Sequence, residues 1–458
     1  MQIGLALAAV LAIQDVAIID VIEGKTLPRR TVVMKEGRIS AITTGKPPQG
    51  AQVVNGSGKF LIPGLWDMHI HLRGGAESIK ANDAMLNLYL AHGVTGVREM
   101  GGDIADTVFQ WRDAIDDGKK LGPKIFTSGP KLDGGKPSWP GSLTVTGPEQ
   151  GVAAVGQLVA KKADLVKLYF DTLDEATLKA ITAAAHKQKL KVAGHLPRNL
   201  TVRDSIEAGI DEVQHAYYYL LAGASVAEGS VSREFGERAA SGKPMTTEEW
   251  ARRLLDDYSQ AQAQAMVAML AKNEVWVTPT LDAGNISIGV GAQPYGRDLR
   301  ARFVPKGIYE SWDPNKGRRR PPSDSFRKIR GEMNQRAVGL VRLLRDGGVA
   351  LLAGSDSGHS NNNIYPGWSL HEEMSLLRDA GLSNAEALRT ATINAAEFFK
   401  ATKRHGSIDK GKAADLVLLD ADPLVDIRNT QRINGVVRDG RWLDRQALDQ
   451  LMIDAGRN

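Results

Sequence analysis

Two histidines lie at a spacing that could hold a metal ion. His69 and His71 form an H-x-H pair inside the run Asp67-Met-His-Ile-His-Leu72. In an extended strand, residues i and i+2 point to the same face, so both imidazoles could bind one cation. An isolated H-x-H can also be a chance surface pair, but apolar residues flank this one. The pair is therefore a candidate for the chelation of one cation.

Two further histidines and one aspartate each lie at the C-terminal end of a predicted strand. His195 closes the run that begins at Lys191, His215 closes the run that begins at Asp211, and Asp356 follows residues 349–355. One such histidine is more often a packed core residue than a ligand, but two of them beside an H-x-H favour a metal site. Asp356 could ligate the ion and accept a proton from water. Its alternative role is to cap the next helix.

Lys167 lies within the apolar run Asp164-Leu-Val-Lys-Leu-Tyr169. A lysine in a buried strand is unusual, because burial disfavours its charged form. A neutral amine can take up carbon dioxide and become an anionic carbamate, which could bridge two divalent cations. A lysine that extends to the rim, or pairs with Asp356, is the alternative. Spacing alone leaves both open.

The composition restricts the kind of site. The 458 residues include nine histidines and no cysteine, which excludes disulfides, a cysteine nucleophile, thiolate zinc sites and iron–sulfur clusters. Any metal must therefore have nitrogen and oxygen ligands. The net charge of +5 is mild for this length and does not demand a polyanionic partner. We expect a small-molecule substrate, no nucleic acid and no membrane span; a homo-oligomer is compatible with the sequence.

The apolar run Ile3–Ile13 is too short to span a bilayer, which needs about 20 residues. It is similar to the apolar region of a secretory signal but lacks the positive segment that precedes one. A first strand with an apolar leader is the alternative. The run favours a periplasmic or secreted location over a cytoplasmic one.

The elements that must position these residues alternate between strand and helix. Clear helical segments with apolar residues three and four apart are Pro148–Lys162 and Asp174–Gln188. Eight strand-like runs are Trp66–His71, Val94–Arg98, Lys124–Thr127, Leu165–Phe170, Lys191–His195, Glu212–His215, Val275–Thr280 and Val349–Ala353. This α/β pattern predicts a (β/α)8 TIM barrel, whose strand ends converge on one catalytic face. A doubly wound open sheet competes, but no G-x-G-x-x-G follows an early strand.

Both ends of the chain are rich in short β runs separated by turns. We expect residues 1–63 and 403–458 to form one composite β-sandwich domain, and residues 64–402 to form the barrel. Excursions near 218–260 and 282–325 interrupt the alternation. Because both follow strand ends, they would cover the mouth of a barrel as lids.

In this order along the chain, His69-x-His71, Lys167, His195, His215 and Asp356 resemble the metal ligands of the amidohydrolase superfamily. Three longer segments carry the same resemblance: Phe60–His71 as the entry to the barrel, Gly93–Arg98 as its second strand, and Gly406–Asp420 as the return to the β domain. Within the superfamily, the chain is similar to the imidazolonepropionase-like and prolidase-like branch.

The resemblance implies a binuclear centre. Two divalent ions, with zinc expected, would be held by His69, His71 and Asp356 on one side and by His195 and His215 on the other. Carboxylated Lys167 and a hydroxide would bridge them. The hydroxide would attack an amide or peptide carbonyl, and Asp356 would carry the proton to the leaving nitrogen. The expected substrate is a dipeptide or an N-acyl amino acid.

Some positions depart from the family pattern. Deaminases carry a Glu shortly after the His195 position, and here Leu-Pro-Arg198 follows. Lys136 stands where many prolidase-like relatives have a histidine, so Tyr217 or Tyr218 could polarise the carbonyl instead. Tyr217 and His359 are further catalytic candidates, and the substrate-binding candidates are Lys136, Trp139, Arg198 and Tyr218. Hydrolysis of esters, lactones or cyclic amides, or a catalytically silent scaffold, are the alternatives.

Overall fold

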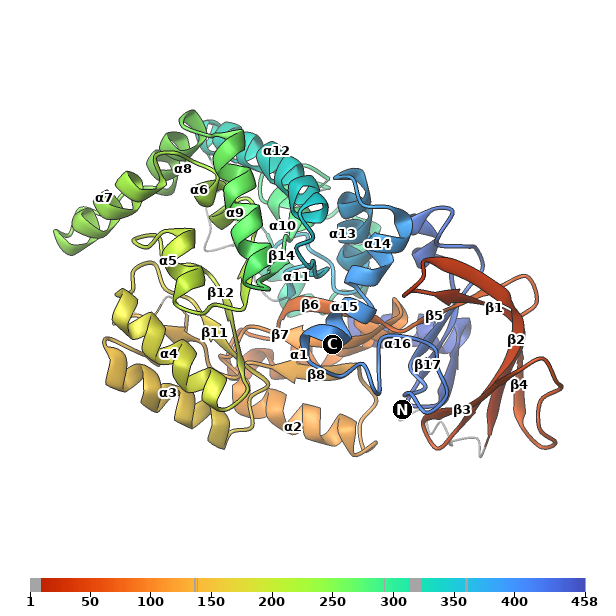
Figure 1. Ribbon diagram of the computed structural model, residues 1–458. Coiled ribbons are helices and arrows are strands. Elements are labelled where there is room, and N and C mark those ends of the chain that lie inside the picture. Colours follow the sequence, from red (N-terminus) through yellow and green to blue (C-terminus); the bar gives the residue numbers. More distant parts are fainter. Residues whose placement is uncertain are drawn as a thin grey trace.

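The computed structural model describes residues 10–135, 137, 139–291, 293–313, 323–358 and 361–457. A region of alternating strands and helices fills most of the molecule, and a large sheet built from both ends of the chain lies at one side of it (Figure 1). Of the apolar run Ile3–Ile13, residues 11–13 lie in the first strand, and residues 1–9 are outside the described part.

The two strand-rich ends pair with each other in one sheet of eight strands. Its order is β18-β17-β16-β5-β1-β2-β3, with β4 paired to β1. The strands are β1 (Leu11–Asp20), β2 (Lys25–Lys35), β3 (Arg38–Thr43), β4 (Gln52–Asn55), β5 (Phe60–Pro63), β16 (Leu416–Leu419), β17 (Ile433–Arg438) and β18 (Arg441–Asp444). A separate hydrophobic cluster lies against this sheet and includes Ile13, Val32, Leu61, Leu416 and Val437.

Strand β1 connects the two halves of this sheet. Its first residues, Leu11–Gln14, pair with β4, whereas Ala17 and Ile18 pair with β5. A register shift separates Ile13 from Val16, and Asp15 between them has a φ of 59°. A bulge of this kind bends a strand and turns its side chains. The described strands form one hydrogen-bonded sheet, and the division into a two-layered sandwich domain stays a prediction.

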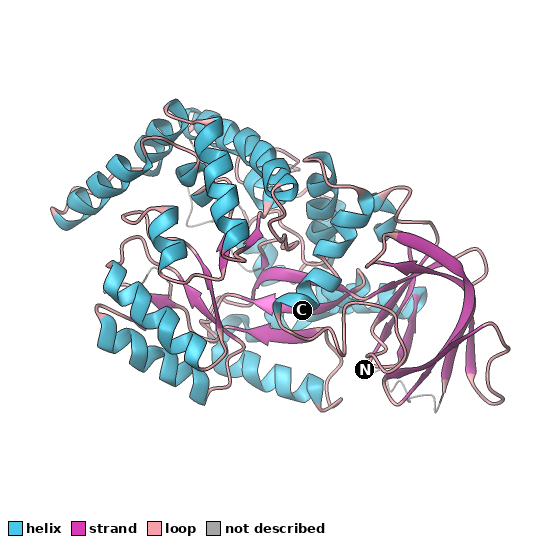
Figure 2. Ribbon diagram, in the orientation of Figure 1, coloured by secondary structure: helices cyan, strands magenta, loops and turns pink. Residues whose placement is uncertain are grey.

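The middle of the chain forms two parallel sheets with helices between most successive strands, as the alternation predicted (Figure 2). One sheet has the order β15-β6-β7-β8 and the other β10-β9-β11-β12-β13-β14. The strands are β6 (Leu65–His71), β7 (Val94–Glu99), β8 (Lys124–Thr127), β9 (Leu132–Asp133), β10 (Leu143–Thr144), β11 (Leu165–Leu168), β12 (Lys191–Gly194), β13 (Glu212–Gln214), β14 (Trp276–Thr278) and β15 (Ser357–Gly358). Their side chains pack against the helices in one extensive core.

A few backbone hydrogen bonds link the two parallel sheets. On one side, the Asp164 N–H donates to the Thr127 carbonyl at 2.9 Å. On the other, the Leu352 N–H donates to the Val277 carbonyl and the Met68 N–H to the Ala353 carbonyl, each at 2.9 Å. The described strands do not join into one closed sheet of eight.

The expected strand Val349–Ala353 is corrected by the structure. Only Leu351 makes an isolated bridge, to Val277, and the regular strand comes later, at β15. The backbone at Gly354 lies very close to its two neighbouring strands. A Cβ on Gly354 would be 2.7 Å from Thr278 Cγ2 and 2.8 Å from His69 Cβ. The segment therefore contacts both neighbours at single points and has no continuous ladder.

The predicted helices are confirmed as α3 (Pro148–Ala160) and α4 (Glu175–Lys187). Asp174 caps α4 by accepting from the Thr177 N–H, which satisfies one of the free donors at the helix start. The other helices that cover the parallel sheets are α1 (Ile79–Ala91), α2 (Ala105–Asp116), α5 (Val202–Glu207), α9 (Gln260–Lys272), α12 (Asp324–Asp346), α13 (Trp368–Asp379), α14 (Asn384–Thr390) and α15 (Ile393–Phe398).

The two excursions are mainly helical. The first carries α6 (Tyr219–Gly223), α7 (Glu228–Ala240) and α8 (Thr247–Asp256), which form the upper left of the molecule in Figure 1. The second carries α10 (Leu281–Ile286) and α11 (Lys306–Ser311), while its residues 292 and 314–322 lie outside the described part. The C-terminal helix α16 (Arg445–Gly456) packs against α1. Across the residues described, no helix combines the length and apolar character needed to cross a bilayer.

Candidate metal centre

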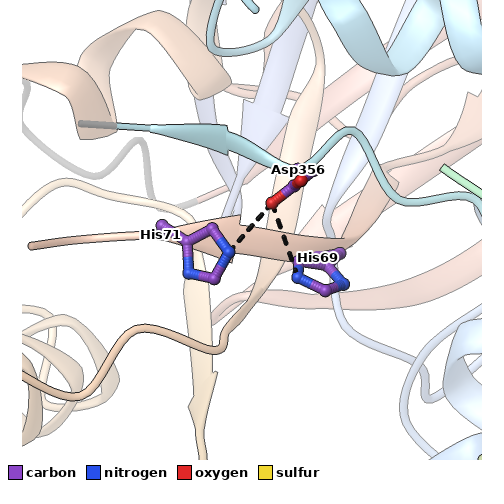
Figure 3. A group of neighbouring side chains, drawn as sticks. All are labelled: His69, His71 and Asp356. Carbon is purple, nitrogen blue, oxygen red and sulfur yellow. Dashed lines mark ion pairs between the residues drawn. The ribbon is translucent and has the colours of Figure 1, made fainter. Parts of the chain in front are cut away.

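The H-x-H pair and Asp356 meet at the ends of neighbouring parallel strands. His69 and His71 are on β6, and Asp356 immediately precedes β15, which pairs with β6. Asp356 Oδ1 lies 2.9 Å from His71 Nε2 and 3.6 Å from His69 Nε2, and Figure 3 shows both contacts as dashed lines. One ligand atom from each of the three residues lies within 4.8 Å of the others. This is the spacing of donors that can share one metal ion.

Two of the predicted ligands, His215 and Asp356, have an unusual backbone conformation. His215 and Asp356 both have a φ of 59°, in the left-handed region that non-glycine residues seldom adopt. Each residue stands directly at the boundary of a short parallel strand, β13 or β15. Such strained residues persist where the surrounding structure holds them, and they cluster at functional sites. Here the turn directs each side chain out of the strand pattern.

The charge state of the histidines suits a metal. Burial holds the pKa of His69 and of His71 well below the usual 6.5. Neutral imidazoles are the metal-binding form. Both ring nitrogens of His69 and Nδ1 of His71 are buried, and the described residues provide them no hydrogen-bond partner. Unsatisfied buried nitrogens are costly unless a ligand occupies them, so these residues fit a metal ion.

His195 and His215 form a second pair beside the first. Their ring centroids are 4.8 Å apart, and that of His215 is 5.0 Å from that of His69. The Nδ1 atom of His215 lies 2.8 Å from Thr280 Oγ1, which fixes the ring and leaves Nε2 to act as a ligand. Burial lowers the pKa of His215 to about 3 and that of His195 well below 6.5. The four histidines therefore line one continuous patch.

Lys167 is buried on β11 and donates a hydrogen bond to the side-chain oxygen of Gln214. Burial holds the pKa of its amine well below 10.5. The neutral amine is the form that can react with carbon dioxide, so the environment is compatible with a carbamate. Carboxylation of Lys167 stays a prediction.

A buried ion pair supports this patch. Arg98 of β7 donates to both carboxylate oxygens of Glu212 of β13, at 2.7 and 2.8 Å, and its Nε donates to the Met68 carbonyl at 2.6 Å. Both side chains are fully buried. Bidentate pairs of this kind are geometrically specific. The pair ties together strands from both parallel sheets beneath the histidines.

The patch opens into a cavity of about 800 Å³. His71, His195, His215 and Asp356 line it, together with the predicted substrate contacts Trp139 and Tyr218 and the predicted catalytic residue Tyr217. Tyr217 Oη lies 3.4 Å from His215 Nδ1. The walls also include residues of both excursions, such as Glu248 and Ile286. A second cavity, of about 920 Å³ between α1 and α16, has none of the predicted ligands.

One predicted substrate contact, Arg198, lies away from the cavity. Arg198 donates to Asp171 at 2.6 Å, packs over Phe235, and does not line the cavity. Lys136 and His359 are outside the described residues. The role of all three in catalysis or substrate binding stays a prediction.

Several residues at the site were not predicted from the sequence. Asn361 donates to Asp356 Oδ1 at 3.0 Å, and the Arg73 guanidinium donates to Asn361 Oδ1 at 2.7 Å. Arg330 lines the cavity from α12. The sequence pattern could have indicated that Arg330 is buried, because this residue lies on the apolar face of α12, in line with Met333 and Ala337.

Comparisons with known proteins agree with this architecture. The family model described as "Amidohydrolase family" matches residues 60–443. Among curated relatives, an N-acetylglucosamine-6-phosphate deacetylase from Lysinibacillus sphaericus is 40% identical over 68 residues, which are 15% of this chain and 17% of that protein. An imidazolonepropionase from Thermoplasma volcanium is 30% identical over 96 residues, 21% of this chain and 23% of that protein. These matches span less than a quarter of either relative.

Solved structures match over nearly the whole length. A bottromycin amidohydrolase has a TM-score of 0.73 at 22% identity, covering 98% of this chain and 91% of that chain. A Xaa-Pro dipeptidase with bound methionine in the active site has a TM-score of 0.67 at 20% identity, covering 95% and 100%. Identities this low show the shared fold alone. The family match over most of the sequence is decisive, and the chain belongs to the amidohydrolase family.

Proposed function

We propose that the protein is a metal-dependent hydrolase that cleaves an amide or peptide C–N bond in a small substrate such as a dipeptide or an N-acyl amino acid. The observation that carries the proposal is the convergence of His69, His71 and Asp356 within 4.8 Å, beside a cavity of about 800 Å³ that His71 and Asp356 line. Membership of the amidohydrolase family supports the same reaction class.

The residues divide into two sets of metal ligands. His69, His71 and Asp356 would hold one divalent ion, and His195 and His215 a second, with zinc expected at both. Lys167, as a carbamate, would bridge the two ions. When bound, such ions lower the pKa of coordinated water and polarise a carbonyl group. The absence of cysteine is consistent with this set of nitrogen and oxygen ligands.

The remaining chemistry falls to side chains that face the cavity. Asp356 would accept the proton of the attacking water and hand it to the leaving nitrogen, because its carboxylate lines the cavity and Asn361 steadies it. Tyr217 would donate a hydrogen bond to the substrate carbonyl, since its hydroxyl lies beside His215 at the cavity wall. The buried walls would limit the access of bulk water.

We further propose that the two parallel sheets constitute a (β/α)8 barrel spanning residues 64–402. The hydrogen bonds that link the sheets through Thr127 and through residues 350–353 support this interpretation. Residues 1–63 and 403–458 would be a separate β domain, which the shared sheet and its own hydrophobic cluster support. The excursions near 218–260 and 282–325 would act as lids, because both contribute residues to the cavity.

The proposal is tested by loading the purified protein with zinc and following cleavage of dipeptides and N-acyl amino acids by chromatography. Each amide is compared with the matching ester, and a set of lactones is included. Faster amide cleavage and about two bound ions per chain are expected. Cleavage of esters or lactones alone would replace the amide assignment. A zinc-loaded protein that hydrolyses none of them would support a silent scaffold.

A further inference from the structure

Arg330 is a buried arginine at the wall of the candidate cavity. It lies in the first half of α12, and its side chain is only 4% exposed. The centre of its guanidinium is 4.0 Å from the ring of Tyr217 and 4.0 Å from the ring of Tyr218. Tyr217 in turn reaches His215 through its hydroxyl. One phenol ring therefore separates this cation from a predicted metal ligand.

The guanidinium lacks an anionic partner among the described residues. Its only hydrogen bond there is from Nε to Ser287 Oγ, at 3.3 Å, and Nη1 is buried without an acceptor. No described carboxylate forms an ion pair with it. One helical turn further on, Asn334 is also buried, with both amide atoms unpartnered in the described part of the chain.

This arrangement is costly without a ligand. A guanidinium keeps its positive charge in proteins, and a buried charge is unfavourable unless it is paired. Two tyrosine faces offset part of that cost, but they leave the in-plane donor Nη1 without an acceptor. A carboxylate would match those donors, because its two oxygens fit the planar fork of an arginine.

The other arginines that line the cavity, Arg73 and Arg327, already have interaction partners. Arg73 donates to Asn361, and Arg198 lies away from the cavity, paired with Asp171. The acidic residues that line the cavity are Glu248 and Asp356, and the proposed function assigns Asp356 to the metal. Arg330 is thus the lining residue best placed to receive an anionic group of the substrate.

We propose that Arg330 binds the free carboxylate of the substrate and so selects N-acylated amino acids and dipeptides over neutral amides and lactones. The inference rests on the proposed function, since it places this carboxylate in the same cavity as the metal ligands. The scissile carbonyl would lie towards His215 and the carboxylate towards α12. Tyr217 and Tyr218 position the guanidinium between them.

The test compares substrates that differ only in this charge. Kinetic constants are measured for alanyl-proline and alanyl-prolinamide, with the zinc-loaded wild type and with Arg330→Gln and Arg330→Lys. Loss of a hydrogen bond to a charged group predicts a rise in KM of about 10- to 100-fold for the acid in Arg330→Gln. The amide should change little, and Arg330→Lys should recover part of the loss because it restores the charge.

A matched control lies on the same helix. Arg336 of α12 also packs over a tyrosine, with its guanidinium 4.3 Å from the ring of Tyr258, but it does not line the cavity. Arg336→Gln should therefore leave both substrates unaffected. Thermal unfolding of each variant shows whether it is folded.

A binding measurement separates this inference from the proposed function. L-proline and L-prolinamide are titrated calorimetrically into the zinc-loaded wild type and Arg330→Gln. Binding of L-proline that weakens selectively in the variant supports the role of Arg330, even if no substrate is cleaved. If the wild type hydrolyses both substrates equally well and the variant matches it, the role of Arg330 is refuted while the hydrolase assignment stands.

Discussion

Ser355 donates two hydrogen bonds to the buried carboxylate of Asp67, from its N–H at 2.9 Å and from its hydroxyl at 2.5 Å. Asp67 stands two residues before His69, and Ser355 stands directly before Asp356. The pair therefore joins the segment that carries the H-x-H to the segment that carries the candidate proton acceptor. Asp67 also accepts from the His69 N–H at 3.2 Å.

Replacing Ser355 by alanine should weaken metal binding without removing a ligand. The hydroxyl donor to Asp67 is lost, so the segment that carries Asp356 is held less firmly against β6. Groups that orient metal ligands typically affect affinity by about 10- to 100-fold. Zinc affinity is measured by competition with a chelating dye. Ser241→Ala, at an exposed serine, serves as the control. Equal zinc affinity in the two variants would show that Ser355 does not position the metal ligands.

Asp356→Asn should abolish most turnover and leave the protein folded. Asparagine also tolerates the left-handed backbone that residue 356 adopts, so the fold has little reason to change. The amide cannot accept the proton, and loss of a general base typically lowers kcat by about 100- to 10,000-fold. Steady-state kinetics and thermal unfolding are compared with those of Asp346→Asn, at an exposed position at the end of α12. Near-normal kcat would rule out Asp356 as the proton carrier.

Lys167→Ala should lose activity and bound metal, and added short carboxylic acids should restore part of both. The buried cavity left by the side chain could admit acetate or propionate in place of the carbamate. Metal content by mass spectrometry and amide cleavage are followed with increasing acid. The exposed Lys179 provides a control variant, Lys179→Ala, which should bind metal and cleave amides without added acid. An active Lys167→Ala protein in the absence of acid would contradict a bridging role.

Buried His371 should make the fold less stable in mild acid. It lies on α13, its ring is 2.8 Å from Thr430 Oγ1, and burial lowers its pKa to about 4. In the unfolded chain the pKa is near 6.5, so the unfolded state takes up a proton first as the pH falls from about 6.5 towards 4. The stability contributed by neutral His371 is present above pH 6.5 and decreases through this window.

The expected loss is about 2 kcal/mol between pH 7 and pH 5, since each pKa unit corresponds to about 1.4 kcal/mol. Urea unfolding of the wild type and of His371→Gln is measured at both pH values. The wild type should lose more stability than the variant by about this amount. An identical change in the two proteins would show that His371 does not titrate in this window.

Much of the architecture could be predicted from the sequence, because it depends on local periodicity. Seven of the parallel strands between Leu65 and Thr278 and the helices α3 and α4 lie close to their predicted bounds, whereas the short strands β9 and β10 were not predicted. The family followed from residue types in a fixed order, and the family model confirms it. Residues 349–353 were wrongly predicted as a regular strand, since an apolar run does not reveal how closely β6 and β14 approach Gly354.

The sequence by itself determined which residues could be ligands: histidines and an aspartate at strand ends, which the parallel topology must bring to one face. Only the tertiary structure decided which polar side chains serve that face. Arg198 pairs with Asp171, whereas Arg330, more than a hundred residues further on, lies against Tyr217 and Tyr218. Spacing sets the direction of a side chain within its own helix or strand, but partners from distant segments are selected by packing and by the need to pair buried charges.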